Sequence, residues 1–207
     1  MQILITHAYG HANKGDWALL QALIDCLAEA FPGAALTGIC RDPAAELAYF
    51  PQVSWRQQLG TSFRRGWRRR LENVTGLIIG VIEELMGGNS SRPAANLLRP
   101  PQCFHGIDMI VAAPGGYLED TNTSIATNLV HLWLAARSGA PLVLAPQSIG
   151  PFRTRFCRRM TARLLRRAAA VCARDHLSYQ TAISQLGLPA CRVHSFCDMA
   201  FFFRPCD

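Results

Sequence analysis

Short apolar segments alternate with amphipathic segments along most of this chain, and this order limits the folds open to it. Segments with the length and composition of buried strands are found at 2–6, 35–40, 53–55, 107–112, 142–145, 170–173 and 192–196. Between most of them, hydrophobic side chains recur three or four residues apart, which is typical of helices with one apolar face. Strands that alternate with helices form parallel sheets covered on both faces. The sequence therefore predicts an α/β fold with a mostly parallel sheet and helices on both faces.

One segment interrupts the alternation. Residues 57–101 combine a run of arginines around Trp67 with a turn-rich stretch at 87–93, and we interpret them as an irregular basic insertion. A chain of 207 residues is long enough to bury one core. We expect a single domain over residues 1–207.

The amino-acid composition limits the cellular location that we expect and the groups that the chain could bind. Half of the residues are hydrophobic, yet no apolar segment is long enough to span a membrane. The amino terminus lacks the basic region of a secretory signal, so we expect a cytoplasmic location. The eight cysteines include no Cys-x-x-Cys pair, and His7 and His11 are the only two of the six histidines that lie within four positions of each other; we expect buried free thiols and no metal. His7 and His11, which flank the first predicted loop, are the two histidines that we would test for catalysis.

Asn13, Gly15 and Asp16 lie where the first predicted strand gives way to a helix. Backbone amides at a helix start can receive an anion or a sugar hydroxyl, and a glycine allows close approach. The alternative is that Asn13 or Asp16 caps the helix, since the first four amides of any helix need partners.

Gly115, Gly116 and Asp120 follow the strand at 107–112 and precede a predicted helix. Paired glycines permit a close backbone approach to a ligand. A tight turn with Asp120 near a helix start explains the same residues equally well.

Gln147, Ser148 and Gly150 follow the strand predicted at 142–145. Amide and hydroxyl side chains supply donors and acceptors that suit a neutral, hydroxyl-rich ligand. Open α/β sheets bind ligands outside the carboxyl ends of their strands, so we predict that these residues contact a substrate.

Arg174 and Asp175 follow the strand at 170–173, and Asp198 follows the last one. Arg174 can pair with a carboxylate or phosphate and is a candidate for substrate binding. Asp175 and Ser178 are predicted to be structural, with Asp175 at a helix start. Asp198 is predicted to be a linker or domain-contact residue.

In their order and spacing, these motifs resemble the N-terminal half of the polysaccharide pyruvyl transferase family, which includes colanic-acid-type and cell-wall pyruvyl transferases. The motifs are 13–16, 115–120, 147–152, 174–178 and 198–201. The resemblance covers nearly the whole chain apart from 57–101. It implies a Rossmann-like domain, similar to the N-terminal domain of a two-domain transferase of the GT-B type.

The resemblance also implies a function. Family members transfer the enolpyruvyl part of phosphoenolpyruvate to two hydroxyls of a sugar, which forms a ketal in the biosynthesis of exopolysaccharides or cell-wall polymers. No cofactor is implied. The catalytic residues of the family belong to a C-terminal domain that is absent from residues 1–207, so none is assigned and we expect this chain alone to have little activity. Its partner would be a sugar or lipid-linked saccharide acceptor.

Two other functions stay open. The first is a non-catalytic remnant or scaffold, which would bind a partner or an anionic membrane through the arginine-rich segments 64–70 and 155–167. The second is a Rossmann-type enzyme that binds a nucleotide sugar, although no Gly-x-Gly-x-x-Gly motif is present. No signature of a nucleic-acid-binding fold is found, so we expect no nucleic-acid partner.

Overall fold

The computed structural model describes residues 1–10, 13–58, 102–121 and 124–204. The strands are β1 (Gln2–Thr6), β2 (Ala35–Cys40), β3 (Val53–Gln57), β4 (Met109–Ala112), β5 (Gly115–Leu118), β6 (Leu142–Ile149), β7 (Ala170–Ala173) and β8 (Val193–Ser195). The α-helices are α1 (Lys14–Ala30), α2 (Pro43–Tyr49), α5 (Ile125–Arg137), α6 (Arg155–Leu165) and α7 (His176–Gln180). Short turns of other helices lie at Gln102–Phe104, Thr181–Gln185, Ala190–Arg192 and Met199–Phe202.

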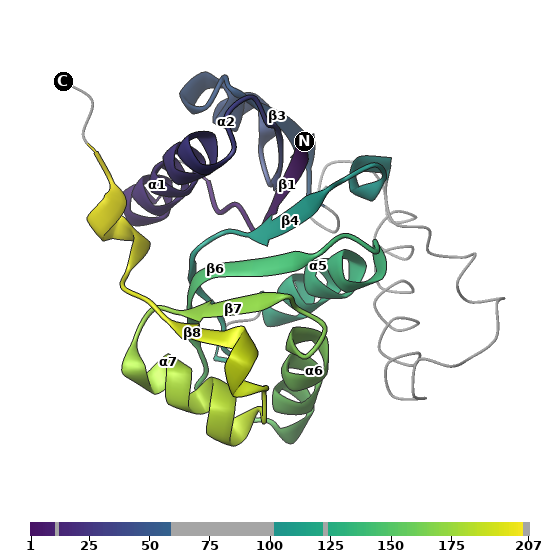
Figure 1. Cartoon of the computed structure of the whole chain (residues 1–207), viewed down its shortest axis with the longest axis vertical. Helices are drawn as coiled ribbons and strands as arrows, with labels where there is room; N and C mark the ends of the chain where they lie inside the picture. Colours follow the sequence, from purple (N-terminus) through teal and green to yellow (C-terminus); the bar gives the residue numbers. More distant parts are fainter. Residues whose placement is uncertain (11–12, 59–101, 122–123, 205–207) are drawn as a thin grey trace, which may run out of the picture.

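The strands form one sheet in the order β3-β2-β1-β4-β6-β7-β8, with β5 paired to β6 beside this path. Every pairing is parallel, and the helices pack above and below the sheet (Figure 1). The predicted α/β fold is confirmed. Because the strands are parallel, all their carboxyl ends meet at one edge, which lies to the left in Figure 1 for β4, β6 and β7.

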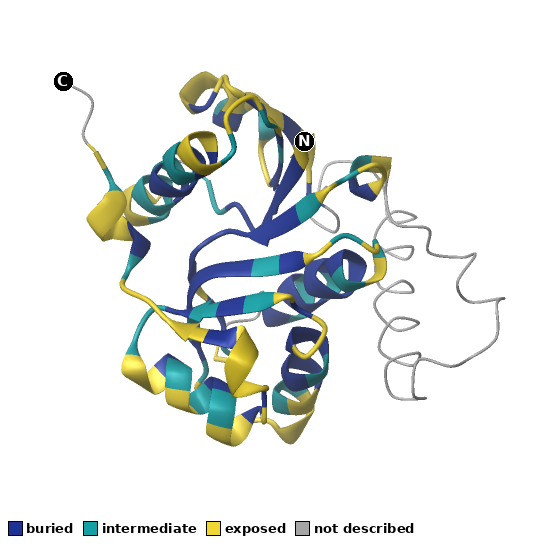
Figure 2. Cartoon of the chain, in the orientation of Figure 1, coloured by how far each residue is buried: buried dark blue, intermediate teal, exposed yellow. Residues whose placement is uncertain are grey.

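The alternation of side chains along each strand builds two cores. Ile3 and Ile5 of β1 point to the face that α1 covers, where Leu23 and Ile24 pack against them. Leu4 points to the other face and belongs to the core formed with α5 and α6. Figure 2 shows that the central strands are mostly buried between the helices, with residues of intermediate burial along β4, β6 and β7. Strands buried on both faces carry near-continuous apolar runs, which is why the sequence revealed them.

The helix starts follow from local chemistry. The Asn13 side chain caps α1, Asp42 caps α2 with Pro43 in the first turn, and Asp175 caps α7. Each of these side chains accepts a hydrogen bond from an amide that would otherwise lack a partner. The capping interpretations of Asn13, Asp42 and Asp175 are confirmed.

The order of the strands creates a topological switch point. The chain moves outward from β1 to β2 and β3, and β4 then pairs with the opposite side of β1, with Thr6 beside Ala112. In open α/β sheets the crevice at such a point, outside the carboxyl ends of the two strands, is the usual place for a ligand.

The structure corrects two predicted loops. Gly115 and Gly116 form a short strand, and β6 continues to Ile149, so that Gln147 and Ser148 lie within it. Gly115 is aligned with Gln147, and Leu118 with Ile149. The two segments satisfy each other's backbone groups beyond the end of β4, and this pairing overrides the preference of a Gly-Gly pair for a turn.

Other predictions have mixed outcomes. Most of the basic insertion, 59–101, lies outside the described residues, and Gln57 belongs to β3.

Cys40 is buried as expected, but Cys191 and Cys197 are exposed, because they lie beside the edge strand β8. Within the described ranges, no helix combines the length and hydrophobicity that crossing a membrane requires.

Candidate functional site

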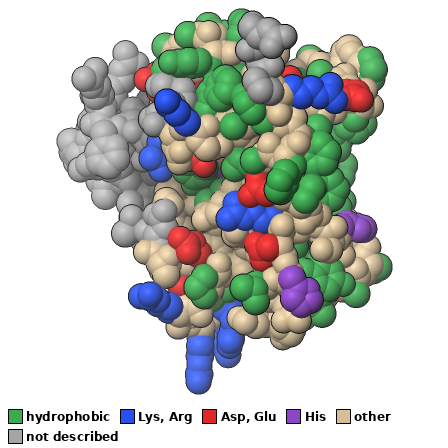
Figure 3. Space-filling view, turned by 90° about the vertical axis from the view of Figure 1, so that its left-hand side faces the viewer, with side chains coloured by type: hydrophobic (Ala, Val, Ile, Leu, Met, Phe, Trp, Pro, Cys, Tyr) green, Lys and Arg blue, Asp and Glu red, His purple; other side chains and the backbone are tan. Residues whose placement is uncertain are grey.

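The predicted motifs all lie at the carboxyl edge of the sheet. Three follow β1, β7 and β8, while the other two include β5 and the end of β6. This edge faces the viewer in Figure 3, where basic and acidic side chains lie close together near the middle of the face. The structure thus brings to one edge residues that are up to 185 positions apart in sequence, from Asn13 to Asp198 (198 − 13 = 185).

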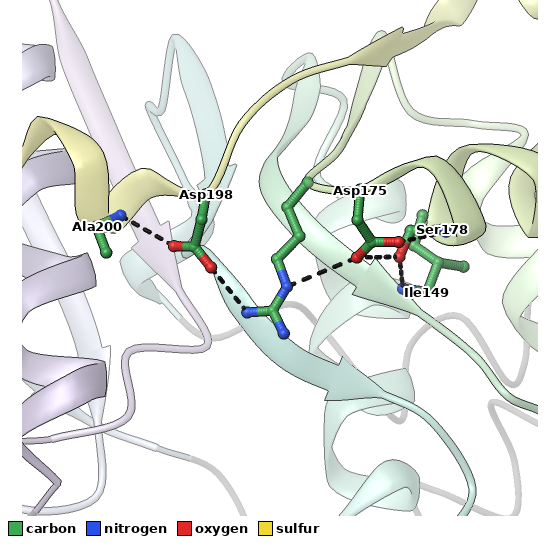
Figure 4. A network of polar contacts seen from close by, with 6 residues as sticks. Ile149, Asp175, Ser178, Asp198 and Ala200 are labelled. Carbon is green, nitrogen blue, oxygen red and sulfur yellow. Dashed lines mark hydrogen bonds and ion pairs between the residues drawn. The ribbon is translucent and has the colours of Figure 1, made fainter.

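Arg174 is the centre of a network on this edge (Figure 4). Its Nη1 donates to Asp198 Oδ2 at 3.3 Å, and its Nε lies 3.8 Å from Asp175 Oδ2. The arginine side chain is about one third exposed, at 31%. Two carboxylates therefore fix the plane of the guanidinium while leaving part of it accessible.

The second half of the network secures the end of β6. Asp175 accepts from the Ser178 amide at 2.7 Å and from the Ser178 hydroxyl at 2.9 Å. The same hydroxyl oxygen accepts from the Ile149 amide at 3.0 Å. These contacts fit the structural roles predicted for Asp175 and Ser178, and they connect α7 to the strand that carries Gln147 and Ser148.

Asp198 forms a hydrogen bond through each of its carboxylate oxygens. Its Oδ1 accepts from the Ala200 amide at 2.9 Å and caps the helical turn Met199–Phe202. Its Oδ2 holds Arg174. The side chain therefore joins the chain after β8 to the end of β7, a role that the sequence did not specify.

Gly116 lies next to this arginine. A Cβ placed on Gly116 would be 3.9 Å from Arg174 Nη2 and 3.8 Å from the Ser148 Cβ. Gly116 is exposed, and Gly115, with φ of +154°, is buried. Gly116, Ser148 and Arg174 therefore meet, as predicted, and a larger side chain at 116 would cover the guanidinium.

Gly150 turns the chain after β6. Its φ is +79°, and its amide donates to the Leu118 carbonyl at 2.8 Å. A Cβ here would lie 3.2 Å from the Thr181 methyl group. The requirement for glycine at this position is explained by backbone conformation; contact with a substrate stays a prediction.

Asp120 holds the loop that starts α6. Its carboxylate accepts from the Arg153 amide at 2.7 Å, the Thr154 amide at 2.6 Å and the Thr154 hydroxyl at 2.7 Å. The hydrogen bond from the Arg153 amide is the main cause that lowers the pKa of Asp120. These bonds give Asp120 a structural role; its predicted contact with a substrate is not seen in them.

Asn13, Gly15 and Asp16 form a local cluster at the start of α1. Asn13 accepts from the Gly15 amide and donates to Asp16 Oδ2, both at 3.0 Å. Burial raises the pKa of Asp16. Asn13 and Gly15 are exposed, so the loop is accessible.

Gln147 is placed differently from what the sequence suggested. Its side chain is fully buried, and its Nε2 donates to the Ala113 carbonyl and, at 2.8 Å, to the Tyr117 hydroxyl. The Tyr117 hydroxyl in turn donates to the Ala113 carbonyl at 2.9 Å. In this arrangement Gln147 organises the segment between β4 and β5 rather than facing a ligand.

A buried polar cluster at the switch point escaped sequence reasoning. His7 has φ of +59°, and among the described residues it is the one non-glycine in the left-handed region. Its ring stacks on Tyr117 with centroids 4.6 Å apart. Non-glycine residues held in this region are concentrated at functional sites, so His7, the residue after β1, makes the switch point a candidate site.

The hydrogen bonds of His7 define its tautomer. Nε2 lies 3.0 Å from the Asn128 carbonyl, which can only accept, so Nε2 carries the proton. Nδ1, 2.9 Å from the Thr6 hydroxyl, then accepts from it. Burial lowers the pKa of His7 to about 4, so the neutral ring connects β1 to α5.

Asn128 and His131 of α5 complete this cluster. The Asn128 side chain donates to the Tyr117 carbonyl at 3.1 Å and accepts from the Tyr9 hydroxyl. Burial lowers the pKa of His131 to about 3, and its Nε2 has no hydrogen-bond partner. The one sequence signal for the cluster was His7 beside the first loop; His11 lies outside the described residues.

The groups at the carboxyl edge of the sheet are suited to binding a ligand. Arg174 supplies a fixed cation, and Ser148 and the Gly116 backbone lie beside it. Among the residues that the structure describes, no three His, Cys, Asp or Glu side chains are grouped so as to hold a metal ion.

Comparisons with known proteins agree with this fold. HepE from Anabaena, determined in complex with UDP, aligns with 96% of this chain and 44% of its own, at 18% identity and a TM-score of 0.50. An uncharacterised protein from Klebsiella pneumoniae aligns with 64% of this chain and 46% of its own, at 16% identity and a TM-score of 0.37. The chain thus matches less than half the length of each.

The family to which this chain belongs is established from its amino-acid sequence. No curated protein matches the chain. The family model for polysaccharide pyruvyl transferase, however, matches residues 13–206, which include every motif placed above at the carboxyl edge of the sheet. The chain therefore belongs to the polysaccharide pyruvyl transferase family.

Proposed function

We propose that this chain forms the acceptor side of a pyruvyl transferase, the N-terminal half of a two-domain enzyme of the GT-B type. Its carboxyl edge would bind a sugar or a lipid-linked saccharide in the biosynthesis of an exopolysaccharide or cell-wall polymer, in the cytoplasm. Family membership supports the class of reaction. The observation that carries the proposal is the Arg174 guanidinium, which two carboxylates hold beside the backbone of Gly116.

The proposed reaction consumes phosphoenolpyruvate. Its methylene carbon takes up one proton, two sugar hydroxyls each form a bond to the adjacent carbon and lose a proton, and the bond to phosphate breaks. Such a step needs an acid and cationic groups that stabilise the departing phosphate. We propose that the catalytic residues belong to the part of the family that this chain does not match, and we assign none to residues 1–207.

The described residues would hold the acceptor in place. Positioning two hydroxyls against one carbon is a large share of the catalytic task, since correct orientation alone contributes roughly 7–11 kcal/mol in favourable cases. Ser148 and the Gly116 backbone can bond to sugar hydroxyls. Arg174 can bond to a ring oxygen substituent or to a phosphate of the acceptor, through the edge that Asp175 and Asp198 leave accessible.

A second candidate function has one observation in its favour. HepE, which shares the fold, was determined with UDP, and an accessible arginine suits a diphosphate. The acceptor would then carry a nucleotide. The test must therefore separate a neutral sugar from UDP.

Ligand binding to the purified chain tests both candidates. Methyl glucoside, galactoside and mannoside are examined by saturation-transfer NMR, and UDP by calorimetry. Gly116→Leu places a side chain over Arg174 Nη2 and should abolish binding of either ligand. Arg174→Met should abolish UDP binding, whereas Arg56→Met on β3, at the opposite end of the sheet, is the matched control and should have no effect.

The outcomes are distinct. Sugar binding that Gly116→Leu removes supports the acceptor-side function. UDP binding without sugar binding, lost in Arg174→Met, supports the second candidate. If neither ligand binds, or if binding is insensitive to both substitutions, the assignment of the carboxyl edge is wrong.

A further inference from the structure

Helix α6 carries a row of arginines on its exposed side. Arg155 and Arg159 are one helical turn apart and exposed, and Arg153 is exposed just before the helix. Arg163 continues the row but takes part in another interaction. Among the described residues, no carboxylate pairs with Arg153, Arg155 or Arg159. These side chains are therefore available to an anion from outside.

The position of these arginines is unfavourable within the chain itself. The first turn of α6 contains no acidic residue, and Arg155 and Arg158 stand in it. The amino end of a helix carries a partial positive charge, which disfavours cations there. Asp120, on the loop after β5, offsets part of this through its bonds to the Arg153 and Thr154 amides.

An apolar side chain stands among the arginines. Phe156 is 45% exposed and lies one turn before Met160 and two turns before Leu164, which the same side of α6 contributes to the core. Because that apolar side is already buried in protein, the helix cannot insert its own hydrophobic face into a bilayer. Contact with a surface would be electrostatic, with Phe156 as a single apolar anchor.

The row also lies close to the candidate site. Helix α6 follows β6, so its first turn stands at the carboxyl edge of the sheet with Ser148 and Gly150. Figure 3 shows basic side chains projecting from the lower margin of this face. A surface bound by α6 would therefore adjoin the opening of the site.

We propose that the surface formed by Arg153, Arg155, Phe156 and Arg159 docks on an anionic membrane. The occupant is the headgroup layer of a bilayer with acidic phospholipids, which complements three unpaired cations and accommodates one exposed aromatic ring. Docking brings the carboxyl edge to the membrane, where a lipid-linked acceptor would be presented. The docking itself does not depend on the proposed transferase function, and the test requires no sugar.

Sedimentation with vesicles tests the proposal. The probes are phosphatidylcholine vesicles with and without about one third phosphatidylglycerol, at low and high salt. The chain should sediment with the acidic vesicles alone, and less at high salt. Arg155→Ala combined with Arg159→Ala should weaken the partition about thirtyfold, because each cation near the surface contributes roughly fivefold.

Two controls make the result specific. Arg56→Ala combined with Arg204→Ala removes the same net charge elsewhere; both side chains are exposed, and the ion pair of Arg204 with Glu29 is at the surface. This variant should keep nearly all of the binding. Phe156→Ala should weaken binding to vesicles severalfold but leave the weak attraction of a DNA duplex unchanged, which separates a membrane from a general polyanion.

The proposal is overturned if the wild-type chain ignores acidic vesicles at low salt, or if the two double variants lose binding equally. It is also overturned if Phe156→Ala binds vesicles like the wild type while the arginine variant loses vesicles and DNA alike, because the surface would then be a polyanion site. Thermal unfolding of each variant verifies that the exposed substitutions leave the fold intact.

Discussion

The buried histidines make the stability of this chain depend on pH. His7 and His131 are 2% and 1% exposed, with ring centroids 5.6 Å apart. Burial lowers the pKa of His7 from 6.5 to about 4, and that of His131 to about 3. Because the folded pKa lies below the unfolded one, the stability due to each neutral ring is complete above pH 6.5 and is lost as the pH falls toward the folded pKa.

The size of the loss follows from linkage. Between about pH 7.5 and about pH 5, the unfolded chain takes up most of a proton at each histidine while the folded chain takes up almost none. This costs about 2 kcal/mol per histidine, and about 4 kcal/mol for the pair. Asp16 acts in the opposite direction, since burial raises its pKa and this favours the folded state as the pH falls.

Urea unfolding followed by tryptophan fluorescence at the two pH values measures the loss. His131→Gln should halve the pH-dependent part, to about 2 kcal/mol. His194→Gln, at an exposed position, is the control and should keep all of it. A wild-type loss under about 1 kcal/mol, or an equal loss in His131→Gln, would refute the account of the buried cluster.

Two substitutions test the packing around the site. Gly38→Ala should lower the free energy of unfolding by about 1–3 kcal/mol, because the added Cβ would clash with the Trp55 ring in the core. An unchanged urea midpoint would show that the ring moves freely. Asn128→Ala removes the partners of the Tyr9 hydroxyl and the Tyr117 carbonyl and should cost about 2–4 kcal/mol. An unchanged urea midpoint in Asn128→Ala would contradict the role assigned to these bonds.

Much of the fold was predictable because it depends on local patterns. The apolar runs of β1 and β2, and the Asp42-Pro43 helix start, are read from residues close together in sequence. The lengthened β6 was not predicted, since the strand continues only because Gly115 and Leu118 pair with it. Pairing between distant segments leaves no trace in either segment alone.

The candidate site was also predictable only in part from the sequence. That Arg174 lies at the carboxyl edge followed from its place after a strand, but its fixation by Asp198 depends on the path of the chain after β8. Gln147 was predicted to face a ligand. Its side chain is instead buried, and its amide donates to the hydroxyl group of Tyr117 in β5. His7 was singled out by its place beside the first loop, but its left-handed conformation was not predicted, because backbone conformation is not encoded by residue type alone.

Amide chemical shifts of the labelled chain test the central claim most directly. During titration with the methyl glycosides and UDP, the amides of Gly116, Ser148 and Arg174, at the carboxyl edge, are predicted to shift together. Gly33, Gly106 and Gly139 precede β2, β4 and β6 at the opposite edge and should not change. Shifts confined to those three glycines would contradict the assignment of the site.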